Sequence, residues 1–360
     1  MSSRVLVLGA GGELGRRVCR LVADLAGAEV LGASRSARGP LGVPMQRADV
    51  GDAASVARLL LAGDLVVNCA GPFHYDPSAL VSACVAARAH YCDLADDVAF
   101  VERVRLAARC SPTAAHGTFV CAGASTLPGL AGVLARRLTR SPRAVEIAQL
   151  RVYLSVGSAN PMSAGLLASL LAPLGRELSD GTRAFAALRA LRVSDGRMLR
   201  FGSYPAAFAD GRLAVGARPV LASFHFGFDR AALSALLKLA APGLGAMPLA
   251  ATAKLARVLL PFANAVRLFG TQHGLLAVVA ENLHGEEIAR IEVAARARGL
   301  DIPAAPPAWI AACIARGDAL PTGNVELAEL VPASAAFKWL RSDSGRTLSS
   351  SPPELVGTET

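Results

Sequence analysis

The stretch VLVLGAGGELG at residues 5–15 restricts the possible fold more than any other part of the sequence. Its four glycines fall within seven positions, between an apolar run typical of a strand and a pattern typical of an amphipathic helix. Glycine accepts positive φ, lets the backbone approach a pyrophosphate and lets a helix pack closely on a strand. The helix would present free N–H groups to the phosphates. A tight turn without a ligand is the alternative. The residues expected to contact a dinucleotide are Gly9, Gly11, Gly12, Glu13, Leu14 and Gly15.

Strand and helix patterns alternate along the first 124 residues. Such alternation implies right-handed βαβ crossovers and therefore an α/β fold with a doubly wound parallel sheet. We predict a Rossmann dinucleotide-binding domain at residues 1–124. Asp52 is a candidate N-cap for the second helix. The expected strands are 4–9, 29–34, 65–69, 91–94 and 118–121, and the expected helices are 12–25, 53–61, 77–88 and 98–110.

The rhythm changes after about residue 125, which predicts a second, α+β domain at residues 125–340. Asn160 is a candidate cap for a helix that begins at Pro161. The helix at 307–315 is a candidate to pack back on the first domain. Residues 341–360 are polar and rich in Pro and Ser, so we expect a disordered tail. The second domain should contain strands at 145–156, 189–204 and 212–226, a hairpin at 275–295 that turns near His284, and helices at 161–171, 231–269 and 307–315.

The end of the second expected strand indicates which dinucleotide binds. An NAD site usually places Asp or Glu there to bind the ribose 2′-OH. This chain has Ser34 and Arg35 instead, with Arg38 nearby. The planar guanidinium of Arg can pair with a 2′-phosphate, so NADP(H) is favoured. A plain surface arginine is the alternative for Arg35. Asp49, before the next helix, could contact the adenine or simply cap a turn.

Three segments resemble the saccharopine dehydrogenase-like NADP-binding proteins. They are VVNCAGPF at 66–73, ACVAARAHYCDLADD at 83–97 and, more weakly, CAGASTLPGLAG at 121–132. SAGLLAS at 163–169 and the segment 299–317 resemble later parts of the same family. This resemblance implies a nicotinamide-dependent oxidoreductase with a Rossmann domain and a second domain for substrate and homodimer contacts. It also implies that the loop of Ala70, Gly71, Pro72 and Phe73 lies along the nicotinamide ribose. Apart from the resemblance, Asn68 and Cys69 end a buried strand, where ligands bind in such sheets, and Gly123 and Ala124 lie at the crossover to the second domain, so we expect cofactor contacts there as well.

Family activities include the reduction of imines and, in the trans-acting enoyl reductase branch, of carbon–carbon double bonds. The chain departs from the family pattern in two places. Asp96 and Asp97 replace a Gly-Glu pair, and SAGLLAS lacks the second Gly and the Thr of the family stretch SGGT. We interpret Asp96 and Asp97 as caps of the following helix.

Hydride transfer is the chemistry of the cofactor, while the protein must orient it and supply or remove a proton. His74 and Tyr75 follow the AGPF loop directly and are the first candidates for proton donors. A polar loop pair with a structural hydrogen bond is the alternative. Tyr91 and Asp93, on the next strand, are further catalytic candidates, with a supporting role as the alternative. His225 and His273 could contact substrate or be buried structural residues.

Composition narrows the function classes. The formal charge is +9, but only three of the 37 basic residues are lysines and no basic stripe with aromatic residues appears. Nucleic-acid binding is therefore not expected. The six histidines show no ligand spacing, so we expect no metal. Seven cysteines form no CxxC pair, and the odd count without a signal peptide favours the cytoplasm.

The predicted function is NADP(H)-dependent hydride transfer to an imine or an activated double bond of a small, largely apolar substrate. Two alternatives remain open. One is a non-catalytic NADP(H)-binding sensor or scaffold. The other is a membrane-peripheral protein that uses the apolar stretch 233–266. Prolines, glycines and basic residues interrupt this stretch, so an integral membrane span is not expected.

Overall fold

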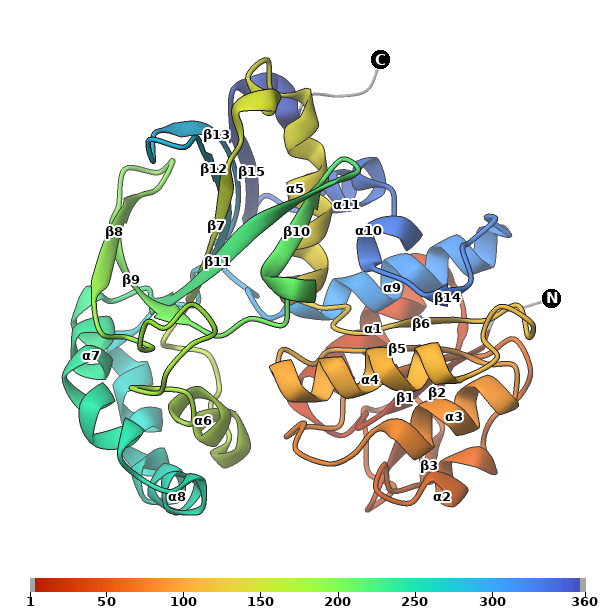
Figure 1. Ribbon diagram of the computed structural model, residues 1–360. Coiled ribbons are helices and arrows are strands. Elements are labelled where there is room, and N and C mark those ends of the chain that lie inside the picture. The colour runs from red at the N-terminus through yellow and green to blue at the C-terminus, as the bar shows by residue number, and fades with distance from the viewer. Residues whose placement is uncertain (1–3, 357–360) are drawn as a thin grey trace. The chain divides into compact units, whose positions relative to one another are not determined.

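The computed structural model describes residues 4–356, and residues 1–3 and 357–360 lie outside the described part. The chain divides into two compact units. Unit 1 comprises Met1–Val133 and Leu300–Ala336, and unit 2 comprises Leu134–Gly299 and Phe337–Thr360. This division differs from boundaries at 124 and 340, because the segment 300–336 returns to the N-terminal unit. Figure 1 shows the elements of both units.

Unit 1 is built on a parallel sheet of seven strands in the order β14-β6-β5-β4-β1-β2-β3. The order 3-2-1-4-5-6 within it is that of a doubly wound dinucleotide-binding fold, which confirms the predicted fold class. Two strands were not predicted, β3 and β14, because runs of three and two residues carry no readable alternation. The strands are β1 Arg4–Leu8, β2 Glu29–Ser34, β3 Met45–Arg47, β4 Leu65–Asn68, β5 His90–Asp93, β6 Phe119–Cys121 and β14 Gly323–Asn324.

Helices α1, α3 and α4 agree within two residues with their predicted positions, whereas α9 begins at Asp301 instead of residue 307, and α5 and α10 were not predicted. Asp52 caps α2 by accepting hydrogen bonds from the N–H groups of Ala54 and Ser55, as predicted, although α2 is shorter than expected. Asp97 caps α4 by accepting from the N–H of Phe100. The helices are α1 Glu13–Ala26, α2 Ala53–Ala57, α3 Ser78–Ala86, α4 Val98–Cys110, α9 Asp301–Arg316 and α10 Leu327–Leu330, and α5 Ala131–Arg137 begins in this unit.

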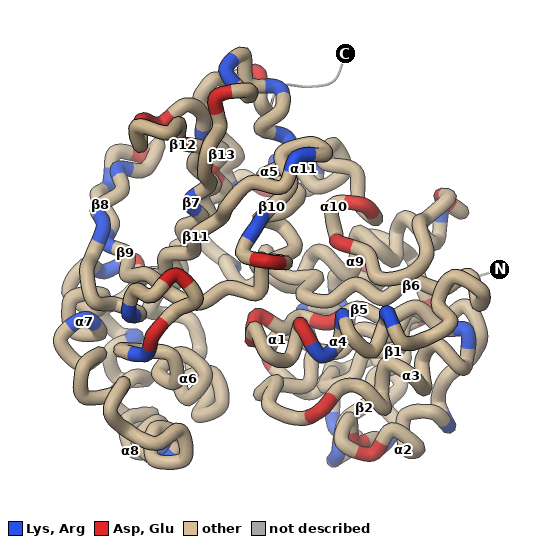
Figure 2. Tube along the Cα trace, viewed as in Figure 1, with Lys and Arg blue, Asp and Glu red and all other residues tan. Residues whose placement is uncertain are grey.

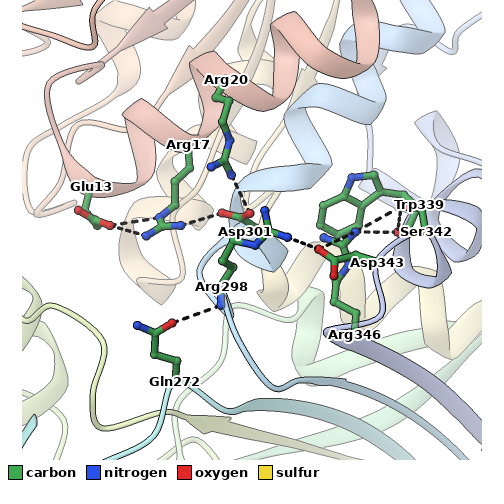
Figure 3. A network of polar contacts seen from close by, with 10 residues as sticks. All are labelled: Glu13, Arg17, Arg20, Gln272, Arg298, Asp301, Trp339, Ser342, Asp343 and Arg346. Atoms are coloured by element: carbon green, nitrogen blue, oxygen red, sulfur yellow. Dashed lines mark hydrogen bonds and ion pairs between the residues drawn. The ribbon is translucent and has the colours of Figure 1, made fainter. Parts of the chain in front are cut away.

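Helix α9 packs against α1 through a buried carboxylate. Asp301 accepts a hydrogen bond from Arg17 at 2.8 Å and from Arg20 at 2.6 Å, and Arg17 also pairs with Glu13 at 2.7 Å (Figure 3). Asp301 is 3 % exposed. A buried charge must be paired, and two guanidinium groups from α1 provide the pairing. This contact joins a helix of the returning segment to the first helix of the dinucleotide fold.

Unit 2 contains a mixed sheet of eight strands. Seven follow the order β15-β13-β12-β7-β11-β9-β8, and β10 pairs with β11. The central pair β7 and β11 is parallel, and the other pairs are antiparallel. The strands are β7 Gln149–Val156, β8 Leu188–Arg192, β9 Met198–Tyr204, β10 Arg212–Val215, β11 Arg218–Phe228, β12 Gly274–Glu281, β13 Glu287–Ala295 and β15 Arg346–Ser351.

The helices of unit 2 are α6 Ala164–Leu171, α7 Ala231–Gly245, α8 Leu249–Val266 and most of α11 Ala333–Arg341. The prediction that Asn160 caps α6 is wrong. Ser163 is the cap, and its hydroxyl accepts from the N–H of Leu166 at 3.1 Å. Asn160 instead donates from its side chain to the carbonyl of Gly157 at 2.9 Å. Both residues are good caps, so the composition of this loop could not decide between them.

The tail prediction also fails over residues 346–356. Strand β15 pairs with β13, and the following 3-10 helix, Pro353–Val356, buries Leu355 and Val356. The carbonyl of Leu355 accepts from the buried guanidinium of Arg137 at 2.8 Å. The guanidinium carbon of Arg346 lies 3.6 Å from the centre of the Trp339 ring. A polar composition resembles disorder, but an edge strand needs only backbone hydrogen bonds and a few apolar anchors. The last part of the predicted tail, 357–360, lies outside the described residues.

Candidate cofactor site and catalytic residues

The glycine turn places the end of β1 against the loop that follows β4. Gly9 has φ of +77°, and a Cβ at this position would lie 2.8 Å from the backbone N of Ala70. A Cβ on Gly15 would lie 2.2 Å from the carbonyl oxygen of Gly9. The turn therefore requires glycine at both positions, as predicted for a strand–turn–helix that approaches a ligand.

The N-terminus of α1 is open. Gly12 stands at the cap position in an extended conformation without a side-chain cap, and Gly12 and Glu13 are exposed. An uncapped helix N-terminus at a glycine turn fits a pyrophosphate, because unpaired N–H groups and the helix dipole attract negative charge. The carboxylate of Glu13 is paired with Arg17 at 2.7 Å. The side chain of Leu14 is half-buried, so only its backbone is placed to meet a phosphate.

The loop after β2 lies against the glycine turn. The Ser34 hydroxyl donates to the carbonyl of Arg38 at 3.1 Å, and a Cβ on Gly11 would lie 2.5 Å from the same carbonyl oxygen. Arg35 and Arg38 are exposed. Within residues 4–356, neither guanidinium forms an ion pair or a side-chain hydrogen bond. Both are thus available for an anion beside the glycine turn.

Arg47 is a further candidate that the sequence reasoning missed. It ends β3, is exposed, and pairs in register with Ser34 at the carboxyl end of β2. A 2′-phosphate near Ser34 would meet guanidinium groups from two neighbouring strands. Arg47 could be found only by recognising β3, since neighbouring parallel strands end at the same edge of the sheet.

Asp49 is exposed and forms a turn. Its Oδ1 accepts from the N–H of Gly51 at 3.0 Å, and its backbone N–H donates to the Ser55 hydroxyl at 3.0 Å. This geometry agrees with the turn-capping interpretation of Asp49. A contact with adenine stays a prediction.

Asn68 is the polar centre of the candidate site. It is fully buried at the carboxyl end of β4, and its Oδ1 accepts from the N–H of Ala70 at 3.1 Å, which fixes the orientation of the amide. Its Nδ2 donates to the hydroxyl of Tyr75 at 2.7 Å and to the hydroxyl of Tyr91 at 3.0 Å. One side chain therefore holds both tyrosines that the sequence singled out.

The AGPF loop runs from Asn68 towards Tyr75. Cys69 continues the strand pairing through a 2.9 Å hydrogen bond from its N–H to the carbonyl of Leu8, and burial raises the pKa of its thiol well above the usual range. Gly71 and Pro72 are exposed. The ring of Phe73 packs on Phe100 with centroids 4.9 Å apart. Gly71 and Pro72 are thus exposed between two residues that are held in place. Their contact with a bound nicotinamide ribose stays a prediction.

Tyr75 and His74 differ in how well they are held. The Tyr75 ring is half-buried and meets Phe100 edge-on, with centroids 5.2 Å apart. Burial raises the pKa of its hydroxyl above the usual range, so the group stays protonated. His74 is exposed, and within the described residues its ring forms no hydrogen bond. Tyr75 is thus the better positioned of the two proposed proton donors.

Tyr91 and Asp93 lie on β5 next to Asn68, and both are fully buried. Asp93 Oδ1 accepts from the N–H groups of Ala95, at 3.0 Å, and Gly123, at 2.9 Å. Burial raises the pKa of Asp93 to about 7, although both backbone N–H groups and the Tyr91 hydroxyl act to lower it. A carboxyl with a pKa of about 7 can change its charge at the pH of the cell, which is unusual for an aspartate.

Gly123 and Ala124 follow β6. Gly123 has φ of +68°, and a Cβ there would lie 2.3 Å from the Pro128 side chain. Ala124 is fully buried, so its side chain is not exposed to a ligand. A cofactor contact at these two positions could use only their backbone and stays a prediction.

His90, His225 and His273 each contact other side chains. His90 stacks on Phe119 with centroids 4.3 Å apart, and burial lowers its pKa. His225 in unit 2 is 4 % exposed and stacks on Tyr153. Burial, followed by the charges of Arg189 and Arg151, lowers the pKa of His225 to about 4. The His273 ring lies 3.4 Å from the Arg197 guanidinium. Among the described residues, no group of three or more His, Cys, Asp or Glu could hold a metal ion.

Comparison with known proteins identifies the N-terminal part of the chain. Residues 5–121 match the family model described as the saccharopine dehydrogenase NADP binding domain. A search of curated proteins found no sequence match.

Solved structures show the fold of the whole chain. Apo saccharopine dehydrogenase (L-Glu forming) from Saccharomyces cerevisiae aligns with a TM-score of 0.59 at 14 % identity, over 97 % of this chain and 99 % of that one. An engineered D-amino acid dehydrogenase bound to NADP+ aligns with a TM-score of 0.48 at 15 % identity, over 100 % and 97 % of the two chains. DAP dehydrogenase from C. glutamicum, in complex with DAP, aligns with a TM-score of 0.46 at 14 % identity, over the same shares.

The family match agrees with the resemblance of the VVNCAGPF segment and with the open glycine turn described above. Residues 5–121 thus match an NADP-binding domain of the saccharopine dehydrogenase type, and the chain as a whole shares the fold of a solved saccharopine dehydrogenase.

Proposed function

We propose that the chain is an NADPH-dependent reductase that adds hydride to the carbon of an imine or of an activated carbon–carbon double bond in a small, largely apolar substrate. The observation that carries the proposal is the hydrogen bonding of Asn68 to both Tyr75 and Tyr91, where β4 ends. Ligands of doubly wound sheets bind at the carboxyl ends of the strands, beside the switch in strand order. In this sheet the order switches between β1 and β4.

NADPH supplies a hydride, which is a proton with two electrons, and becomes NADP+. The substrate also needs a second hydrogen, which arrives as a proton. That proton goes to nitrogen in an imine and to the neighbouring carbon in an activated alkene. Tyr75 is suited to donate it. Its hydroxyl oxygen accepts from Asn68 Nδ2 at 2.7 Å, which leaves the hydroxyl hydrogen to point elsewhere. Within the described residues no acceptor for this hydrogen is found.

Asn68 orients the donor and cannot relay protons. Its amide gives both N–H hydrogens to tyrosine hydroxyls, and its carbonyl oxygen is occupied by the N–H of Ala70. Tyr91 is fully buried, so its position is fixed by packing as well. A rigid donor lowers the cost of reaching the reactive geometry. After one turnover the Tyr75 oxygen regains a proton from solvent, which its half-exposed position permits.

The experiment is a turnover assay that follows NADPH consumption with cyclic imines and with enones. We expect Tyr75→Phe to lower kcat by roughly 10²–10⁴-fold and to leave the NADPH dissociation constant nearly unchanged. His74→Ala is the matched control for the neighbouring donor, and it should change kcat little. Near-normal kcat in Tyr75→Phe would refute this assignment of the acid.

A non-catalytic sensor is the second candidate. Stoichiometric NADPH binding without turnover on any imine, enone or carrier-bound substrate would support it over the reductase. For either function we also propose a cytoplasmic homodimer, and light scattering of the purified chain tests the dimer.

A further inference from the structure

Three helices of unit 2 carry an unusual amount of exposed apolar surface. We call α6, α7 and α8, with the 3-10 helix Arg267–Phe269 that follows, the α6–α8 lobe. Figure 1 shows these helices gathered at one end of unit 2. Half of the exposed large apolar residues of the described chain lie in the lobe, namely Leu166, Leu236, Leu239, Leu249, Val258, Leu259, Phe262, Leu268 and Phe269. Apolar patches of this kind mark interaction sites on soluble domains.

The exposed residues of α8 form a stripe. Thr252 and Ala256 are buried on one side of the helix, which packs against α6. Val258 and Phe262 stand on the other side at i, i+4 spacing, and Phe269 follows seven residues later. Phe262 is 63 % exposed and Phe269 is 77 % exposed. The helix thus keeps one side against the protein and presents large apolar groups on the other.

The charged residues in and next to helices α7 and α8 are all basic. From residue 230 to residue 280 the chain contains no Asp or Glu, and its basic residues are Arg230, Lys238, Lys254, Arg257 and Arg267. Figure 2 shows α7 and α8 without acidic residues. Two of the three lysines of the whole chain lie here. Exposed phenylalanine and leucine beside a purely basic charge are the pattern of a helix that lies in a membrane interface.

We propose that the α6–α8 lobe docks on the surface of an anionic lipid bilayer, with Phe262, Leu268 and Phe269 inserted at the level of the headgroups. Charge complementarity selects this occupant. A second copy of the chain would bring two sets of basic residues together with no acid in either lobe to offset them, so like charges would oppose a symmetric dimer. An anionic surface instead attracts the exposed Lys238, Lys254 and Arg257.

The lobe lies on the bilayer and does not cross it. Among the described residues, one helical segment, Leu249–Phe269, is long and apolar enough to span a membrane. Only 11 % of its most apolar 18-residue stretch is buried in the protein. Lys254 and Arg257 would stand inside the hydrocarbon of a spanning helix, at a cost of about 2.5–3.5 kcal/mol each. Surface docking leaves both at the headgroups and keeps Thr252 and Ala256 in place.

Vesicle co-sedimentation with the full-length chain tests the proposal. We expect binding to vesicles of phosphatidylcholine with 30 % phosphatidylglycerol, a composition of about one anionic lipid in three, and little binding to phosphatidylcholine alone. The double variant Lys254→Gln with Arg257→Gln should lower partitioning by roughly 25-fold, since each basic side chain near the surface contributes about five-fold. High salt should have a similar effect on the unaltered chain.

A second variant separates insertion from charge. Phe262→Gln with Phe269→Gln should lower partitioning at least about tenfold, because the apolar contribution is lost while the charge is kept. Leu283→Gln is the matched control. Leu283 is 90 % exposed but lies outside the lobe, in the turn between β12 and β13, and its replacement should leave partitioning unchanged. NADPH titration of each variant serves as the folding control and tests the cofactor site separately from docking.

Two results would overturn the proposal. One is equal, weak binding of the chain to anionic and neutral vesicles at low salt. The other is a dimer in solution that the phenylalanine variant dissociates, which would make the lobe a contact between copies of the chain. Neither result bears on the reductase function, because the lobe contains none of the residues assigned to catalysis.

Discussion

The buried carboxylate of Asp93 accepts a hydrogen bond from the backbone N–H of Gly123 across 2.9 Å. This contact joins the carboxyl end of β5 to the turn after β6, where Gly123 adopts φ of +68°. The carboxyl group therefore joins the ends of two neighbouring strands, next to Asn68 and the two tyrosines that it binds. Its protonation affects the stability of the chain.

The first prediction concerns pH and Asp93. Its pKa is about 7 in the folded chain against an ordinary value of 3.8, so between these values the folded chain binds the extra proton. The free energy of unfolding should fall as the pH rises through this window, by up to about 1.4 kcal/mol per pH unit, and level off above pH 7. Asp93→Asn removes this titration.

Urea unfolding at several pH values checks the expectation. The difference in free energy of unfolding between the Asp93→Asn variant and the unaltered chain should increase in favour of the variant from pH 5 to pH 7. Because other titrating groups are shared, they cancel in this difference. Parallel curves across the window would show that Asp93 is already ionised in the folded chain at pH 5.

The second prediction concerns Gly9. A methyl group at Gly9 meets positive φ and also the backbone of Ala70 at 2.8 Å. Gly27 also has positive φ, +58°, but no atom lies within 4 Å of its Cβ position. Gly27→Ala should therefore cost about 1–2 kcal/mol from backbone strain alone. Gly9→Ala should cost more and should weaken NADPH binding at least tenfold. Equal stability losses with unchanged NADPH affinity would contradict the close approach.

The third prediction concerns cofactor choice. Arg35→Ala should weaken NADPH binding by about 1.5–3 kcal/mol, which is the typical free-energy contribution of a hydrogen bond to a charged group. It should change NADH binding little. Arg47→Ala should act in the same direction if both arginines meet the 2′-phosphate. Arg58→Ala is the matched control, since Arg58 is also exposed but lies at the C-terminal end of α2. Fluorescence titration with both cofactors measures the effect, and equal affinities in the unaltered chain would refute it.

The fourth prediction concerns the C-terminal segment. Leu355 is 0 % exposed, and its neighbour Glu354 is exposed. Leu355→Ala should lower the free energy of unfolding by about 2–5 kcal/mol, as in other buried Leu→Ala changes. Glu354→Ala should stay within about 0.5 kcal/mol. Chemical denaturation of both variants makes the comparison. A negligible effect of Leu355→Ala would restore the interpretation of a dispensable tail.

Some elements could be predicted to the residue, while the long helix α9 was predicted six residues too short at its start. The helix Val98–Cys110 and the strand Glu29–Ser34 have the predicted bounds, because their hydrophobic pattern extends over several turns or alternations. Short elements could not be predicted. Strand β3 has three residues, and it exists because its backbone pairs with β2. With β3 unrecognised, Arg47 could not be placed beside Ser34.

The candidate site was predictable as a set of residues but not as an arrangement. The sequence indicated Asn68, Tyr75, Tyr91 and Asp93 separately, from their positions on or after expected strands. That Asn68 binds both tyrosine hydroxyls depends on the register of β4 against β5, which places Asn68 beside Asp93. No pattern within one segment contains that information.

The sequence alone determined the glycine turn and the doubly wound sheet and predicted a preference for NADP(H), because these depend on local backbone geometry, hydrophobic periodicity and residue types at one strand end. Only the tertiary structure decided the return of 300–336 to unit 1, the pKa of Asp93 and the ordering of 346–356. Those three depend on burial and on pairing between distant segments. Such interactions arise only when the chain has folded, and a linear pattern does not encode them at any single position.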